Sequence, residues 1–209
     1  MISDEFLAWF KAATEDKWHR TSIERAIFGF QFLPGTRWNP GLPEEAIREY
    51  QEVLAVRFPN DFIAFLRSMN GTDKETLNIY GSSGEPHRRS VGVYSYPRDL
   101  EIVRNLIEDI RANLDGISKM LAGHRYDLPR GAGVVPIFSH RFVVCGPDPE
   151  SSVVLSIVTN DVDAIVYARS LEDYLVREFL KPEDDITSAK RAASILRSRL
   201  QKARPRRRR

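Results

Sequence analysis

Two amphipathic segments, each preceded by a proline, constrain the fold more than any other feature of the sequence. They follow Pro43 and Pro59, and the apolar residues of both recur at the three- and four-residue spacing of one buried helix face. These apolar positions are Ala46, Ile47, Tyr50, Val53 and Leu54 in the first segment, and Phe62, Phe65, Leu66 and Met69 in the second. Asn70-Gly71 then supplies the left-handed exit that commonly ends a helix. We therefore predict a helix pair, entered through a turn at 38–41.

The remaining chain divides into helical and strand-like stretches. Helices are predicted over residues 4–18 and 22–32, after Pro97, and over 171–180, where Ser170 and Asp173 resemble a capping box. In the first of these helices, an apolar side is expected from Phe6, Leu7, Trp9 and Phe10. An irregular stretch is expected between Gly123 and Gly133. The strand-like runs are 76–80, 91–96, 134–138, 142–145, 153–158 and 163–167. Helices come first in the chain and strands cluster later, without strict alternation between the two. This order predicts an α+β fold, in which helices pack around one mixed, largely antiparallel sheet.

Charge is distributed unevenly along the chain. From Thr187 onward there are ten Lys/Arg and no Asp/Glu, which leaves residues 1–186 with 21 basic and 29 acidic residues and a net charge of −8. We therefore predict a single domain over residues 1–183, with N-terminal helices in 1–33 and a core in 38–180. Residues 184–209 are predicted to form a basic helical extension and a disordered poly-Arg tail, because such a tail cannot bury itself.

The composition favours a protein of the cytoplasm. A single cysteine, Cys145, excludes an internal disulfide and suits a reducing compartment. The N-terminus has acidic residues where a secretory signal would be basic, and no apolar run is long enough for a membrane span. We predict a cytoplasmic protein without a membrane partner.

Residue types that carry chemistry do not form a recognisable motif. The sequence has neither of the common glycine-rich nucleotide-binding patterns, and the loop Gly81–Gly84 lacks the lysine and helix that a phosphate site needs. His124, His140 and Cys145 do not have the paired spacing of a zinc site. Cys145 lies in an apolar run, which favours a buried, inert thiol. We therefore expect no catalytic residues, no metal and no cofactor.

Several motifs together resemble the SUKH superfamily of Smi/Knr-type proteins. The signature is a tryptophan, a Pro/Gly turn and an acidic amphipathic helix, followed by a proline-started helix that ends in Asn-Gly. The resemblance continues through Gly123–Tyr126 and through Val154–Asp161 into Ser170–Leu175, so it covers roughly residues 38–180. The fold-signature positions are Trp38, Gly41, Pro59, Phe62, Phe65, Leu66, Asn70, Gly71 and Tyr174.

The resemblance implies a mixed sheet surrounded by helices and a binding function. Bacterial members of the superfamily look like immunity proteins that bind and neutralise toxins, often nucleases, and eukaryotic members act in cell-wall signalling. The shared residues are markers of the fold and do not identify a partner-binding surface. An acidic body agrees with this function, since a nuclease presents a basic surface onto which an acidic protein can be steered.

The leading hypothesis is thus a non-catalytic immunity protein that binds a toxin domain. Two alternatives stay open: a regulatory or scaffold module of the same family without a toxin partner, and a nucleic-acid-associated protein that acts through residues 187–209. Clustered arginines displace counterions from phosphates. No aromatic residue accompanies them in this segment, so base stacking is not expected there.

Overall fold

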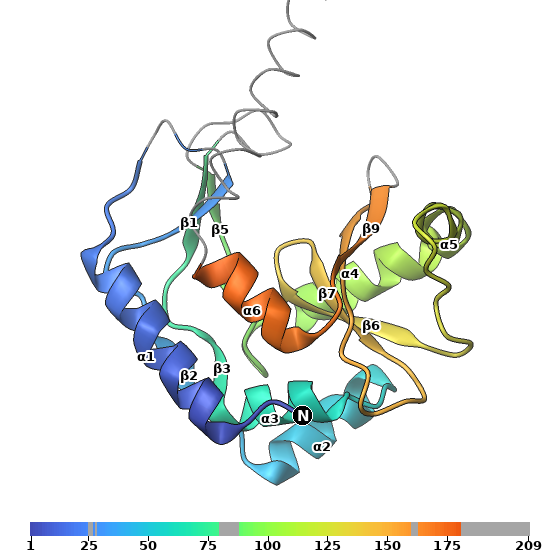
Figure 1. Cartoon of the computed structure of the whole chain (residues 1–209), viewed down its shortest axis with the longest axis horizontal. Coiled ribbons are helices and arrows are strands. Elements are labelled where there is room, and N and C mark those ends of the chain that lie inside the picture. The colour runs from blue at the N-terminus through green and yellow to red at the C-terminus, as the bar shows by residue number, and fades with distance from the viewer. Residues whose placement is uncertain (25–26, 28, 80–87, 160–162, 181–209) are drawn as a thin grey trace, which may run out of the picture.

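Apolar residues at helical spacing give six α-helices in the part of the chain that the structure describes. The computed structural model describes residues 1–24, 27, 29–79, 88–159 and 163–180. The helices are α1 (Asp4–Arg20), α2 (Glu44–Leu54), α3 (Asn60–Ser68), α4 (Leu100–Ala112), α5 (Leu114–Gly123) and α6 (Leu171–Phe179) (Figure 1). The helices predicted at 4–18, after Pro43, after Pro59 and at 171–180 are all present, and the Ser170 side chain accepts a hydrogen bond from the Asp173 amide, as a capping box requires.

The described strands form three antiparallel sheets, and the α+β class is confirmed. They are β1 (Gly29–Phe32), β2 (Trp38–Pro40), β3 (Met69–Thr72), β4 (Thr76–Ile79), β5 (Arg88–Ser90), β6 (Gly133–Phe138), β7 (Arg141–Cys145), β8 (Val154–Val158) and β9 (Asp163–Ala168). The sheet orders are β1-β4-β5, β2-β3 and β6-β7-β8-β9. The prediction of one sheet is therefore wrong, because β1 to β5 pair among themselves as two small sheets.

The β6–β9 sheet is buried on both faces. Its strands pair as a simple meander in which Val134 is opposite Val144 and Val135 is opposite Val143. Successive side chains of a strand point to opposite faces, so the valines are divided between two hydrophobic clusters. Val135 and Val143 join the main core with α2, α3 and α6. Val134 and Val144 join a second core under α4 and α5.

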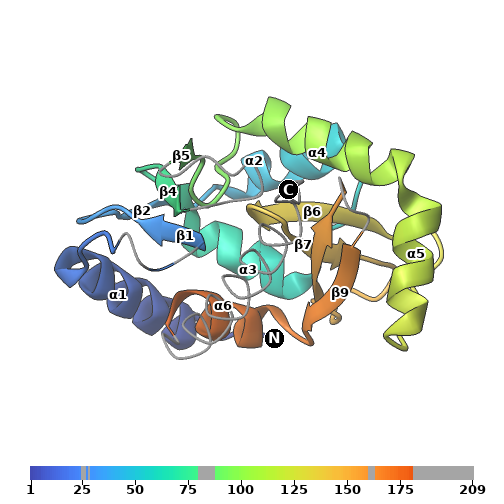
Figure 2. The same ribbon diagram turned by 90° about the horizontal axis from the view of Figure 1, so that it is seen from above.

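The first and last described helices close the main core together. Lys17 on α1 donates a hydrogen bond to the Phe179 carbonyl oxygen at 2.8 Å, and the Phe179 ring lies 5.8 Å from the ring of Phe10. Figures 1 and 2 both place α1 at one end of the molecule and α5 at the other. The main core thus extends from α1 to the four-stranded sheet.

Two predictions for residues 22–41 are wrong. Residues 29–32 form a strand, β1, and Phe30 and Phe32 pack against Phe138 at ring distances of 5.4 and 5.3 Å. Gly29 has a φ of 103°, which a helix does not permit. Trp38–Pro40 is a strand rather than a turn, and it pairs with β3. Tertiary pairing therefore overrides the local helical pattern in this region.

Two further differences occur before the four-stranded sheet. Residues 91–96 do not form a continuous strand, and Val93 makes only an isolated bridge to Phe138. The helical region beyond Pro97 consists of two helices, because Asn113 interrupts it with a non-helical φ of −111°. The second of these, α5, was not predicted as a separate helix. It matters because its apolar face covers the second core.

The described part of the chain has no helix long and apolar enough to cross a membrane. The basic helix and tail predicted for 184–209, and the domain boundary at residue 183, lie outside the described residues, as does the loop Gly81–Gly84.

Candidate functional site

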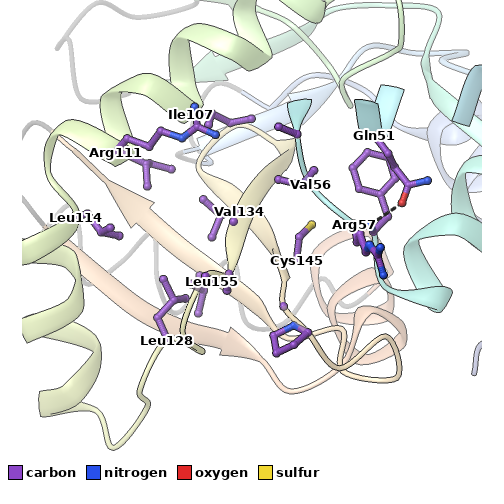
Figure 3. Close-up of a pocket in the computed structure, with 18 of the residues that line it drawn as sticks. Gln51, Val56, Arg57, Ile107, Arg111, Leu114, Leu128, Val134, Cys145 and Leu155 are labelled. Atoms are coloured by element: carbon purple, nitrogen blue, oxygen red, sulfur yellow. Dashed lines mark hydrogen bonds between the residues drawn. The ribbon is translucent and has the colours of Figure 1, made fainter. Parts of the chain in front are cut away.

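A cavity of about 970 Å³ opens where α2, α4 and α5 meet the four-stranded sheet. Val134, Cys145 and Leu155 line it from the sheet, and Arg57 and Arg111 lie on opposite sides of it (Figure 3). The Gln51 side chain accepts a hydrogen bond from the Phe58 amide at 2.8 Å, which fixes the connection from α2 to α3 at one wall. This is a mostly apolar site of the size that binds small molecules.

The three residues considered as metal ligands, His124, His140 and Cys145, are not brought together in one metal site. Cys145 is buried, and burial raises the pKa of its thiol far above the ordinary value. His140 is largely buried beside Arg141, and His124 is exposed at the end of α5. Among the described residues, no group of three or more His, Cys, Asp or Glu side chains is arranged to hold a metal ion.

The burial of His140 predicts that the stability of the fold depends on pH. Burial, with a smaller contribution from Arg141, lowers the pKa of His140 to about 3 from 6.5. The folded protein therefore binds fewer protons than the unfolded chain between these values, so stability is fully present above about pH 6.5 and is lost as the pH falls. We expect His140→Gln to lose less stability than the wild type between about pH 7 and about pH 4. Urea unfolding at both pH values measures the difference, and equal losses in both proteins would contradict it.

Trp38 is a core residue at the junction of α1, α3 and α6. Its indole nitrogen donates a hydrogen bond to the Thr14 hydroxyl at 2.8 Å, and its amide donates to Glu15 Oε1 at 3.0 Å. Four aromatic rings surround it at 5.3–5.8 Å, those of Phe10, Trp18, Phe65 and Phe179. This residue fixes the small β2-β3 sheet against the helices and does not reach the surface.

The two signature glycines are required by close backbone contacts. A side chain on Gly41 would collide with the Arg67 carbonyl oxygen at the end of α3. Gly71 has a φ of 71°, and a Cβ atom there would lie 2.6 Å from the Val93 carbonyl oxygen. Both positions therefore accept only glycine without a shift of the backbone.

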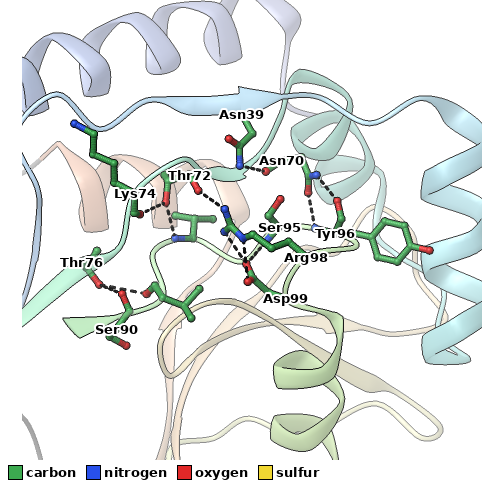
Figure 4. Close-up of polar contacts among 12 residues, drawn as sticks. Asn39, Asn70, Thr72, Lys74, Thr76, Ser90, Ser95, Tyr96, Arg98 and Asp99 are labelled. Carbon is green, nitrogen blue, oxygen red and sulfur yellow. Dashed lines mark hydrogen bonds and ion pairs between the residues drawn. The ribbon is translucent and has the colours of Figure 1, made fainter. Parts of the chain in front are cut away.

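The Asn70 side chain links β3 by two hydrogen bonds to the segment that leads into α4. Its amide nitrogen donates to the Tyr96 carbonyl oxygen at 2.6 Å, and its amide oxygen accepts from the Tyr96 nitrogen at 2.9 Å (Figure 4). Beside it, the Asp99 carboxylate accepts from the Ser95 amide and from Arg98, both at 2.8 Å. The prediction that Asn70-Gly71 caps a helix is wrong, because α3 ends at Ser68 and both residues belong to β3.

The other signature residues also lie in the interior. Pro59 occupies the N-cap position of α3. Phe62, Phe65, Leu66 and Tyr174 are all buried in the main core. The Tyr174 hydroxyl has no hydrogen-bond partner in the described part of the chain, and burial raises its pKa well above 10. The structure thus brings the signature positions together as parts of one scaffold.

The outward face of α1 carries an exposed tryptophan that sequence reasoning misplaced. The sequence groups Phe6, Leu7, Trp9 and Phe10 on one apolar side, but only Leu7 and Phe10 are buried. Trp9 is 53% exposed and contacts the half-buried Phe6 ring at 5.6 Å. A turn of 3.6 residues places Trp9 roughly 200° from Leu7 around the helix, and this phase difference was the available signal.

Acidic and small side chains surround Trp9 on the same helix. Exposed residues near Trp9 along α1 are Glu5, Ala8, Ala12 and Asp16. Backbone and Ser3 hydrogen bonds lower the pKa of Glu5, so this carboxylate is charged at neutral pH. Arg20 forms an ion pair with Asp16 at the far end. The Trp9 face, defined by Trp9 and these four residues, is therefore an exposed aromatic surface with carboxylates at Glu5 and Asp16.

Comparisons with known proteins give no family assignment for the chain. No protein-family model matches it, and no curated protein matches it significantly.

Proposed function

We propose that this chain is a non-catalytic binding protein of the toxin-immunity type, which neutralises a basic toxin domain by direct contact. The observation that carries the proposal is the Trp9 face: an aromatic side chain exposed on a helix whose opposite side is locked into the core. Tryptophan is the residue type most enriched among the dominant contacts of protein interfaces.

The charge of the protein supports a basic partner. Residues 1–186 carry a net charge of −8, and two of their carboxylates lie on the Trp9 face: Glu5, and Asp16, which pairs with Arg20. Complementary charge steers two proteins together and suppresses wrong partners. A nuclease has a basic surface because it binds phosphates, so an acidic surface on this chain is suited to cover it.

The arrangement of the scaffold supports the same proposal. α1 is anchored through Trp38, which binds Thr14, and through Lys17, which binds the end of α6. A partner that docks on α1 therefore meets a surface that is already ordered, and little conformational entropy is lost on binding. The residues of the motifs that resemble the SUKH superfamily are packed in the core. The outward side chains of α1 are not needed for this packing and can contact a partner.

Trp9→Ala is expected to weaken partner binding by about 2 kcal/mol, roughly a thirtyfold rise in Kd, and to lower the stability by less than about 1 kcal/mol. The partner is first captured from the native host with residues 1–186 as bait, and its affinity for both proteins is then measured by calorimetry. Met120→Ala is the matched control, because Met120 is 39% exposed on α5, at the far end of the molecule.

An unchanged affinity in the Trp9→Ala protein would contradict the proposed surface. Loss of binding in both variants would also contradict it, because the effect would then not be local to α1. Thermal unfolding of both variants shows whether the fold is intact.

The basic residues from Thr187 onward favour a second candidate function, contact with nucleic acid. This segment has ten Lys/Arg and no acid. Filter binding to DNA and RNA across a range of salt concentrations, with the full chain and with residues 1–186, separates this function from toxin neutralisation. Binding that requires the segment and weakens steeply with salt would support it.

A further inference from the structure

The cavity between α2, α4, α5 and the four-stranded sheet differs from the rest of the molecule in charge. Four arginines line it, Arg48, Arg57, Arg111 and Arg130, and Glu52 is the only Asp or Glu among its described lining residues. The surrounding body is acidic, with a net charge of −8 over residues 1–186. A positive rim of this kind is therefore a local feature and does not follow from the composition.

Three of the four arginines have no acidic partner in the described part of the chain. Arg48 lies 3.5 Å from Glu45, whereas Arg57, Arg111 and Arg130 form no ion pair with a described residue. All three are exposed and come from different segments: the α2–α3 connection, α4, and the loop before β6. Guanidinium groups bind carboxylates and phosphates through paired hydrogen bonds, so these side chains are available to an anion.

The interior of the cavity is apolar. The sheet contributes Val134 and Leu155, and the helical layer contributes Ile107 and Leu114 (Figure 3). Leu114 is 41% exposed, so apolar surface faces the opening. A volume of about 970 Å³ is within the range of sites that enclose small organic ligands. Burial of apolar ligand surface there would stabilise a complex through the hydrophobic effect.

We propose that this cavity binds a small amphiphilic anion, a single apolar chain that ends in a carboxylate or phosphate, with the chain on the sheet and the anionic group at one of the two arginines on the rim, Arg57 or Arg111. The apolar lining of the cavity would contact the chain of such a ligand, and the arginines on the rim would bind its anionic group. Charge excludes two other occupants: the segment after Thr187 has ten Lys/Arg and no acid, and a basic toxin surface would also be repelled by the rim. The site is independent of the Trp9 face.

Titration calorimetry of the full chain with dodecanoate, dodecyl phosphate and dodecanol, each below its aggregation concentration, tests the proposal. We expect both anions to bind with one molecule per chain and dodecanol to bind at least about tenfold more weakly, since hydrogen bonds between charged groups are stronger than those to a neutral hydroxyl. Equal binding of dodecanol would overturn the role of the arginines, and no binding of either anion would overturn the site.

Two pairs of variants locate the ligand. Leu114→Glu places a carboxylate at the cavity, and Met120→Glu makes the same charge change at a similar exposure on the same helix, outside the cavity. Arg57→Gln with Arg111→Gln removes two positive charges from the rim, and Arg104→Gln with Arg125→Gln removes two exposed charges that do not line it. We expect the first member of each pair to weaken dodecanoate binding about tenfold or more and the second by less than about twofold.

Equal effects within either pair would place the ligand elsewhere and overturn the proposal. All substituted side chains are at least partly exposed, and thermal unfolding checks that each variant is folded. An anionic lipid membrane presents the same combination of apolar chain and negative charge, and sedimentation with phosphatidylglycerol vesicles tests whether the protein binds one. Binding to vesicles without binding to free dodecanoate would overturn the cavity site in favour of a membrane surface.

Discussion

Trp38→Ala is expected to lower the free energy of unfolding by about 3–5 kcal/mol, the usual cost of removing a buried tryptophan or phenylalanine side chain. Trp38 is 5% exposed and is enclosed by four aromatic rings. The substitution leaves a cavity between α1, α3 and α6 and also leaves the Thr14 hydroxyl without its indole donor. Urea unfolding followed by circular dichroism measures the change.

Trp9→Ala is the matched control for this prediction, because the same atoms are removed from a side chain that is 53% exposed. Its cost in stability is expected to be below about 1 kcal/mol, as for most surface substitutions. Equal destabilisation by the two substitutions would contradict the placement of Trp38 in the core. The difference in the free energy of unfolding between the two variants therefore distinguishes a tryptophan that stabilises the core from one that is exposed on the surface.

Glu178→Ala is expected to destabilise the protein by about 3–5 kcal/mol, because it leaves a buried arginine without its counter-ion. Glu178 Oε2 lies 3.1 Å from Arg141 Nε, and the two side chains are 17% and 14% exposed. The Arg141 guanidinium also lies 3.9 Å over the Tyr167 ring and donates to the Ser156 hydroxyl, so it cannot easily turn to water.

Glu44→Ala provides the comparison on the surface. Glu44 pairs with Arg67 at 2.6 Å, which is shorter than the buried pair, but the side chains are 51% and 56% exposed. Its loss is expected to cost less than about 1 kcal/mol, since water solvates the arginine that remains. Chemical unfolding of both variants gives the two values, and a larger loss for Glu44→Ala would show that distance rather than burial controls the contribution.

The fold class could be predicted because long segments carry a clear periodicity. The apolar faces of α2, α3 and α6, and the dense apolar runs of β6 to β8, leave few alternatives. The failures occur where partners distant in sequence decide the outcome. Gly29–Phe32 becomes a strand through pairing with Thr76–Ile79, which local spacing does not report. Asn70 is held by Tyr96, 26 residues away, and therefore does not cap its own helix.

The candidate sites were less predictable than the fold. The sequence analysis predicts that Trp9 belongs to an apolar side of its helix, although the angular position of Trp9 on α1 separates it from Leu7. The arginines around the cavity come from segments between residues 48 and 130, and only the folded chain brings them together. The expectation that Cys145 is buried agrees with its position, yet its place beside a cavity follows from the packing of α4 and α5, and α5 itself was not recognised.

The closure of the main core by Phe179 has a consequence for how the protein is made. Synthesis proceeds from the N-terminus, so α1 leaves the ribosome long before α6 exists. Until then Phe10 and Trp18, which pack against Phe179 at 5.8 and 6.3 Å, lack one of their covering side chains. A contact of such sequence separation forms late and slows folding. Nascent chains that stop before Leu171 therefore lack the part of the main core that α6 supplies. During the time between the synthesis of α1 and that of α6, chaperones that recognise exposed aromatic side chains can bind α1.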